Sequence, residues 1–397
     1  MTACAIEAAA RDTAAARTGT TGTEPESAAR PGITVTADGT YAARLAGTGE
    51  ALFAERWTLD GPEPYAVPLP MDQPEEPEAD VLPMADGRVL IRRRVAGRHT
   101  FSLLYPTGPG TGERLLGGLE SARLTLVPPS PDGVCVYALT PGEASTGIWR
   151  VAGGAFGPEH VADVPGHCSG GVWLDRTGRM LALDRRPPGG GPVKAVAVDL
   201  ERGGEVTPLL QITQDSHDRL LLADPDSGLL VIRSDAPGPG QGRLGWGVLG
   251  SLLPVRFPPC LWLPDAVLTP FAVQPGQVLT PESCAVALRI DGAAGSWLGV
   301  WRPSARRLHQ LAAPEGWLAG GGVVSREGVL QLPYTTGAVP CGVARMDASD
   351  VLLPAAAAAP AQMERAGGEP CDGVGSPVVC RPVPLQQAPL TDQSAGG

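Results

Sequence analysis

The sequence predicts an all-β fold, a seven-bladed β-propeller made of four-stranded antiparallel blades. Three observations lead to this prediction. Short apolar runs rich in β-branched residues alternate with turn signals, a pattern typical of antiparallel sheets. The 53 glycines and 42 prolines lie largely between these runs, where they serve as turn residues. A turn glycine recurs every 45 to 52 residues, close to the length of one propeller blade.

The clearest repeat unit spans residues 121–166. Its first two predicted strands, at 124–127 and 134–139, are joined by a Ser-Pro-Asp-Gly turn at 130–133. Proline fixes φ in this turn, and glycine supplies the position that needs a positive φ. The third and fourth strands are predicted at 148–151 and 161–164. A single sheet of this size cannot bury both faces, so the unit needs neighbours.

Six other stretches repeat the first strand, the turn and the second strand. The turn glycines of the seven units are Gly39, Gly87, Gly133, Gly178, Gly228, Gly276 and Gly328. Apolar runs suited to a third and a fourth strand follow most of these turns. The sixth unit is irregular because its second strand is displaced to residues 285–290. Rings of six or eight blades are therefore the alternatives to seven.

The seventh unit lacks an immediate fourth strand. Residues 350–376 are rich in alanine, glycine and proline, a composition typical of a flexible insert. Residues 378–385 resemble the other fourth strands and are expected to complete the last blade. We therefore predict one propeller domain over residues 30–390, with disordered segments at 1–29 and 391–397. Packing of the seventh blade against the first would close the ring and remove exposed sheet edges.

The turn at residues 130–133, together with Ile148 and Trp149 in the third strand, resembles the WD40-like (TolB-type) β-propeller repeat. The N-terminal propellers of prolyl-oligopeptidase-like enzymes have a similar blade. The full Ser-Pro-Asp-Gly turn occurs in one unit, while the turns that end at Gly39 and Gly87 keep Asp-Gly. The Trp-Asp dipeptide of true WD40 repeats does not occur. The resemblance extends over the predicted domain and implies a propeller fold.

The chain of 397 residues is acidic, with a net charge of −11 at pH 7 and a pI of about 5.0. An acidic surface repels nucleic-acid phosphates and anionic membranes, so neither is an expected partner. No apolar run approaches the length of a membrane span, and residues 1–30 lack the apolar core of a secretory signal. We therefore expect a cytoplasmic protein. Lys194 is the only lysine and asparagine is absent, a bias typical of a high-GC genome such as that of an actinobacterium.

The eight cysteines are dispersed and form no Cys-x-x-Cys pair. In a cytoplasmic chain this predicts free thiols rather than disulfides or a zinc site. His160, Asp163 and His167 are spaced unlike the usual zinc-binding motifs. No metal and no other cofactor is therefore predicted.

The Gly-His-Cys-Ser-Gly-Gly stretch at 166–171 is the most suggestive polar cluster. In a catalytic interpretation, Cys168 or Ser169 would be the nucleophile and His167 or His160 its base. The stretch does not fit the Gly-x-Ser-x-Gly nucleophile elbow, because position 167 is histidine. A loop between two blades explains its composition without catalysis, and no catalytic residue is predicted. The same interpretation applies to a second polar cluster, Asp215, His217 and Asp218.

Loops that join the fourth strand of one blade to the first strand of the next ring one mouth of the central channel. Propellers commonly bind ligands and partners on such a loop-built surface, so we predict a binding site there. The candidate residues are Ser121, His167, Ser169, Asp215, His217, Trp262, Asp265 and Trp317. The Ser-Pro-Asp-Gly turn lies at the other end of its blade and is predicted to be architectural.

The predicted function is that of a non-enzymatic scaffold, a monomer that binds an unidentified protein partner. Fold alone does not determine function, so the alternative stays open. That alternative is an enzyme, a hydrolase or lyase, or a small-ligand binder that uses polar residues at the channel mouth. Convergence of His167, Asp215 and His217 around one pocket would favour it.

Overall fold

The computed structural model describes residues 32–238, 242–276 and 278–348. The chain divides into two compact units, residues 1–353 and 354–397, and every described residue belongs to the first. Strands dominate, and the all-β prediction is confirmed. No helix in the described residues is both long and apolar enough to span a membrane. The helices among these residues are three short 3₁₀ turns, η1 (Leu200–Arg202), η2 (Pro259–Leu261) and η3 (Pro281–Ser283).

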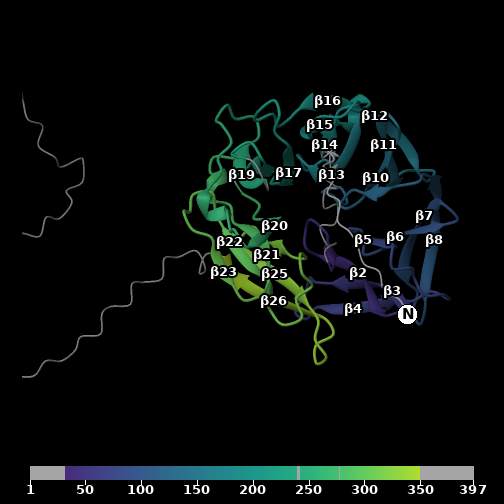
Figure 1. The fold of residues 1–397 in the computed structure, drawn as a ribbon. Coiled ribbons are helices and arrows are strands. Elements are labelled where there is room, and N and C mark those ends of the chain that lie inside the picture. Colours follow the sequence, from purple (N-terminus) through teal and green to yellow (C-terminus); the bar gives the residue numbers. More distant parts are fainter. Residues whose placement is uncertain (1–31, 239–241, 277, 349–397) are drawn as a thin grey trace, which may run out of the picture. The chain divides into compact units, whose positions relative to one another are not determined.

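Three four-stranded antiparallel meanders come first along the chain (Figure 1). In each, strands that follow one another in sequence are hydrogen-bonded neighbours. Blade 1 contains β1 (Thr34–Val35), β2 (Tyr41–Thr48), β3 (Ala51–Thr58) and β4 (Tyr65–Leu69). Blade 2 contains β5 (Asp80–Pro83), β6 (Val89–Val95), β7 (Arg98–Pro106) and β8 (Thr111–Glu120). Blade 3 contains β9 (Thr125–Leu126), β10 (Val136–Pro141), β11 (Ser145–Ala152) and β12 (Glu159–Pro165).

Four further meanders complete the described part of the chain. Blade 4 contains β13 (His167–Trp173), β14 (Met180–Arg186), β15 (Lys194–Asp199) and β16 (Glu205–Pro208). Blade 5 contains β17 (Asp218–Ala223), β18 (Leu229–Ser234) and β19 (Arg243–Val248). Blade 6 contains β20 (Ala266–Val273), β21 (Val286–Gly292), β22 (Gly295–Trp301) and β23 (His309–Leu311). Blade 7 contains β24 (Val323–Val324), β25 (Val329–Tyr334) and β26 (Gly342–Asp347).

The outer strands of blades 5 and 7 differ from the regular pattern. The predicted fourth strand of blade 5, residues 253–257, pairs with β19 through one bridge, between Trp246 and Arg256. The predicted fourth strand of blade 7, residues 378–385, lies outside the described residues, as do the predicted insert and the predicted disordered ends. The blade count of the whole chain therefore stays a prediction. The displaced second strand of the sixth unit is confirmed as β21.

The structure corrects one predicted loop. Most of the stretch 166–171 is strand, because β13 starts at His167 and only Gly166 separates it from β12. Gly170 and Gly171 have φ angles of 74° and 142° and form a bulge at which the register with β14 shifts. Glycine tolerates such angles, so a glycine-rich run can continue as a strand. Asp218, also predicted to lie in a loop, is the first residue of β17.

The core lies between neighbouring blades. The described residues contain seven clusters of buried apolar side chains, and each cluster joins two adjacent blades. Six of them join blades that follow one another in sequence. In the seventh, Ile33, Ala42 and Trp57 of blade 1 pack with Leu318 and Val343 of blade 7. Side-chain packing at this seam closes the ring (Figure 1).

The turns between first and second strands also contact one another. The backbone N–H of Ala85, in the turn of blade 2, donates to the carbonyl of Gly133 in blade 3 at 3.0 Å. Asp226, in the turn of blade 5, pairs with Arg176 of blade 4 and with Arg326 of blade 7. The repeated turns thus form a belt of contacts at the end of the blades opposite the inter-blade loops.

Candidate functional site

The eight residues predicted to surround the channel mouth all precede or begin the first strand of a blade. Ser121 precedes β9, and His167 and Ser169 lie in β13. Asp215 and His217 precede β17. The remaining three precede β20 or β24, and these are Trp262, Asp265 and Trp317. Since the first strands of a propeller run in the same direction, these residues belong to the same end of their blades.

Several of these residues already have partners in the fold. The hydroxyl of Ser121 donates to the carbonyl of Arg123 at 2.6 Å. His217 Nδ1 accepts the backbone N–H of Val193 at 3.1 Å. Trp317 Nε1 donates to the carbonyl of Gly321 at 3.0 Å, and its ring packs on Phe271. The guanidinium of Arg243 lies 4.9 Å from the ring centre of Trp262. These contacts give the four residues architectural roles.

The other four residues, His167, Ser169, Asp215 and Asp265, are exposed. Within the described residues, no hydrogen bond or ion pair joins any two of them. The same residues contain no group of three histidine, cysteine or carboxylate side chains that could hold a metal ion. Among the described residues, no hydrogen bond or ion pair joins His167, Asp215 and His217, whose convergence would favour the enzyme or ligand-binding alternative.

Behind the mouth, two buried carboxylates join blade 4 to blade 5. Asp184 in β14 lies opposite Ser169 and accepts the backbone N–H of Leu220 at 3.1 Å. Burial raises the pKa of Asp184 to about 6, although this carboxylate also lies 3.6 Å from Arg219. Sequence reasoning missed Asp184, because nothing in the β14 sequence distinguishes a buried aspartate from a surface one.

Asp218 is the second buried carboxylate. It accepts hydrogen bonds from Lys194 Nζ at 2.8 Å and from the hydroxyls of Ser216 and Ser234 at 2.9 and 2.6 Å. Burial alone would raise the pKa of Asp218, but these hydrogen bonds outweigh it and the pKa is lowered. The only lysine of the chain is therefore engaged in the contact between two blades.

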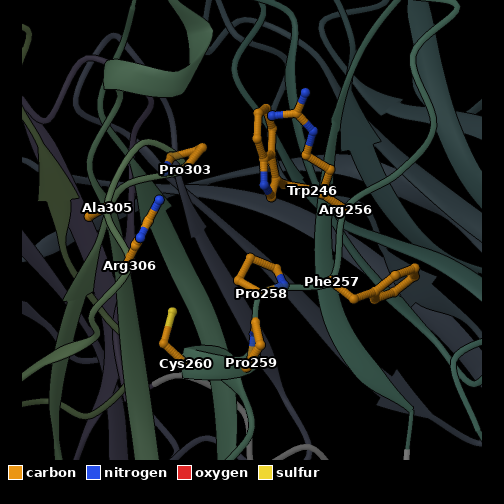
Figure 2. Close-up of a pocket in the computed structure, with 9 residues that line it drawn as sticks. All are labelled: Trp246, Arg256, Phe257, Pro258, Pro259, Cys260, Pro303, Ala305 and Arg306. Carbon is orange, nitrogen blue, oxygen red and sulfur yellow. The ribbon is translucent and has the colours of Figure 1, made fainter.

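A pocket of about 460 Å³ lies between blades 5 and 6 (Figure 2). One wall is Trp246 in β19 and the segment that leaves blade 5 and includes η2. The other wall is the turn between β22 and β23. The lining residues are Trp246, Arg256, Phe257, Pro258, Pro259, Cys260, Pro303, Ala305 and Arg306.

The pocket carries two arginines and no carboxylate. The guanidinium of Arg256 lies 5.1 Å from the ring centre of Trp246, and Figure 2 shows the two side chains together. Arg306 belongs to the opposite wall. Neither guanidinium has an ion pair or hydrogen bond within the described residues. Burial raises the pKa of the Cys260 thiol, which is therefore neutral at pH 7.

An exposed apolar surface lies on turns of blades 5 and 6. It consists of five aliphatic side chains that are 39% to 103% exposed: Leu249, Leu252, Leu253, Val278 and Leu279. The first three lie in the turn after β19, and the other two lie in the connection between β20 and β21. Both segments are tied to the turn of blade 5, since Leu249 donates to the carbonyl of Gly228 and Gly276 donates to Asp224. We call this set the apolar turn surface.

Solved structures with a similar fold include several propellers. Oligogalacturonate lyase from Vibrio parahaemolyticus matches with a TM-score of 0.50 and 11% identity, over 79% of this chain and 88% of that chain. The β-propeller domain of the Trilobed protease from Pyrococcus furiosus matches with a TM-score of 0.49 and 10% identity, over 81% and 95%. Putative TolB from Agrobacterium tumefaciens matches with a TM-score of 0.38 and 18% identity, over 55% and 76%.

No protein-family model matches the sequence, and no curated protein matches it either. At identities of 10% to 18%, the structural likeness concerns the fold alone. The match to oligogalacturonate lyase, with a TM-score of 0.50, agrees with the β-propeller fold that the sequence repeat predicts.

Proposed function

We propose that this β-propeller is a non-enzymatic scaffold that binds a protein partner through the apolar turn surface. The observation that supports the proposal is the exposure of five aliphatic side chains on neighbouring turns. Exposed apolar side chains gathered on one part of a surface mark protein-interaction sites, since water contact with each of them is unfavourable. Burial of one leucine side chain against a partner contributes about 1.5 to 3 kcal/mol.

Hydrogen bonds hold the turn that carries the leucines in a defined conformation. The backbone N–H of Ser251 donates to the carbonyl of Val248 at 3.1 Å. The hydroxyl of Ser251 accepts the backbone N–H of Leu253, also at 3.1 Å. Leu252 and Leu253 are therefore displayed by an ordered turn, and a partner that binds them loses little conformational entropy in the scaffold.

The proposed surface lies on the end of the propeller opposite the predicted channel mouth. The leucine turn connects a third strand to a fourth strand, and the segment with Val278 and Leu279 connects a first strand to a second one. Both kinds of connection lie opposite the inter-blade loops. The partner should thus carry a matching apolar patch and should leave His167 and Ser169 accessible.

The test is a paired set of substitutions. The double variant L252S/L253S removes apolar contact area from the surface, and the control L115S/F156S changes two side chains of blades 2 and 3 that are 68% and 96% exposed. Proteins cross-linked to the wild-type chain in its source cells are identified, purified and titrated by calorimetry. We expect L252S/L253S to weaken binding at least tenfold, and the control to bind like the wild type.

Equal affinity of the wild type and L252S/L253S would contradict the proposed surface. An equal loss of affinity in both double variants would also contradict the proposed surface, because it would indicate a nonspecific apolar attraction. Light scattering of the purified wild type tests the accompanying prediction of a monomer. A dimer that L252S/L253S dissociates would identify a second copy of the chain as the partner.

The position of Asp184 favours a second candidate function, a hydrolase or lyase at the channel mouth. Its pKa of about 6 suits proton transfer near neutral pH, and Ser169 lies opposite it across the β13–β14 pair. Metal analysis and a panel of ester and uronide substrates test this function in the wild type. Turnover that S169A or D184N abolishes would replace the scaffold proposal.

A further inference from the structure

The arginine pocket between blades 5 and 6 has features that the scaffold function does not use. The whole chain has 42 acidic and 31 basic residues, and many of its arginines pair with a carboxylate. Arg93, for example, pairs with Glu75 and Glu113, and Arg44 pairs with Glu55. Arg256 and Arg306 share one pocket and have no such partner within the described residues.

The two guanidinium groups approach the pocket from different blades. Arg256 stacks on Trp246, and stacking fixes the plane of its guanidinium and reduces the entropy lost on binding an anion. Arg306 belongs to the opposite wall, in the turn after β22. Each guanidinium can donate charge-assisted hydrogen bonds to an anionic group bound in the pocket.

The rest of the lining is apolar and stiff. Pro258, Pro259 and Pro303 have no backbone N–H, so they add apolar surface without hydrogen-bond donors. The ring of Phe257 and the neutral thiol of Cys260 extend this surface. A volume of about 460 Å³ lies in the range of pockets that bind small organic ligands.

We propose that this pocket is a binding site for a small organic anion that combines a carboxylate with a planar apolar body. The carboxylate lies between Arg256 and Arg306, and the apolar body packs against Trp246 and the proline walls. This site differs from the predicted channel mouth, and it is independent of the apolar turn surface. It also gives a role to two arginines that share one pocket and have no carboxylate partner in the described part of this acidic chain.

Calorimetry with three probes tests the chemistry of the site. 2-Naphthoate carries both the carboxylate and the planar body, 2-naphthamide lacks the charge, and acetate lacks the body. We expect 2-naphthoate to bind the wild-type chain, and each of the other two probes to bind at least tenfold more weakly. Absence of naphthoate binding at about 1 mM would overturn the proposal, as would equal binding of the amide.

Arginine variants test the location. R256Q and R306Q should each weaken naphthoate binding roughly tenfold, because each removes one charge-assisted pair. R307Q is the matched control, since Arg307 is the next residue, is also exposed and does not line the pocket. All three positions are exposed, so thermal unfolding should stay near that of the wild type. Unchanged affinity in R256Q and R306Q, or an equal loss in R307Q, would overturn the proposed site.

Thiol labelling gives a readout that depends on position. Bound 2-naphthoate should slow alkylation of Cys260, measured at this residue by mass spectrometry at pH 9. Cys341 in blade 7 is also a partly exposed free thiol, and its labelling rate should stay unchanged. Equal protection of both thiols, or of neither, would contradict binding in the pocket.

Discussion

Asp184 is a buried carboxylate whose ionisation opposes folding. The residue is 6% exposed, and burial raises its pKa from 3.8 to about 6. A folded-state pKa above the unfolded one favours the protonated form in the native state. The contribution of this group to stability is therefore fully present below about pH 4 and is lost as the pH rises through about 6.

The variant D184N should remove this pH dependence. Asparagine keeps an oxygen that can accept the N–H of Leu220, but it has no charge to bury. At pH 7.5 we expect the variant to be more stable than the wild type by at most about 3 kcal/mol, and this difference should vanish near pH 4. Urea unfolding at both pH values measures this stability difference. The control variant is D265N, since Asp265 is exposed. A stability difference that does not change with pH would contradict the raised pKa of Asp184.

Sequence reasoning located single residues better than it located groups of residues. It placed the eight mouth candidates at the starts of first strands, which follows from the repeat. It could not show that Ser121, His217 and Trp317 are bound to backbone atoms, because those partners depend on loop conformation. The sequence did not indicate a site at Arg256 and Arg306, because these residues lie in different blades. Only the packing of blade 5 against blade 6 places both in one pocket.

Thr146 stabilises the junction between blades 3 and 4 at the level of secondary-structure elements. It lies in β11 and is fully buried. Its hydroxyl donates to the carbonyl of Gly166 and accepts the backbone N–H of Cys168, both at 2.9 Å. One side chain thus satisfies two backbone groups at the entry to β13, where a single glycine separates the blades.

Replacing Thr146 by valine keeps the shape of the side chain and removes both hydrogen bonds. We expect T146V to lower the free energy of unfolding by about 2 to 4 kcal/mol, because two buried polar groups lose their partner. Chemical denaturation measures the change. T207V is the control, since Thr207 is exposed in β16 and its hydrogen bond to Ala197 is long, at 3.5 Å. A change in T146V no larger than that in T207V would contradict the role of Thr146.

Element prediction succeeded where turn chemistry and apolar runs agreed. The turn at residues 130–133 lies in the connection between β9 and β10. The apolar runs predicted on either side of it overlap these two strands. It failed at residues 166–171, where a glycine-rich composition suggested a loop. There the glycines accommodate a bulge inside β13, and the positive φ of Gly170 and Gly171 cannot be inferred from composition.

At the scale of the molecule, the constant spacing of turn glycines predicted the ring because each repeat must bury its faces against two others. The structure meets that requirement with a buried cluster at every junction between the described blades. Sequence spacing could not indicate how blade 7 meets blade 1. That contact joins residues almost 300 positions apart, such as Ile33 and Leu318.

Shortening Ile33 tests the seam between blades 1 and 7. Ile33 is 2% exposed and packs with Trp57 and Leu318. We expect I33A to lower the free energy of unfolding by about 2 to 4 kcal/mol and to speed hydrogen exchange first in β1 and β24. V267A is the control, because Val267 is 46% exposed. Uniform acceleration of exchange in all blades would argue against a local role for this residue.

The seam also has a mechanical consequence. At the other six junctions the polypeptide itself crosses from blade to blade, so the two sheets cannot separate without stretching the chain. At the junction of blades 7 and 1, the described residues are held by apolar side chains and by one backbone hydrogen bond, from Gly32 to Ala319 at 3.2 Å. Tension applied between residues 32 and 348 would open the ring there first. The closed ring would then become a string of blades, each still tethered to the next.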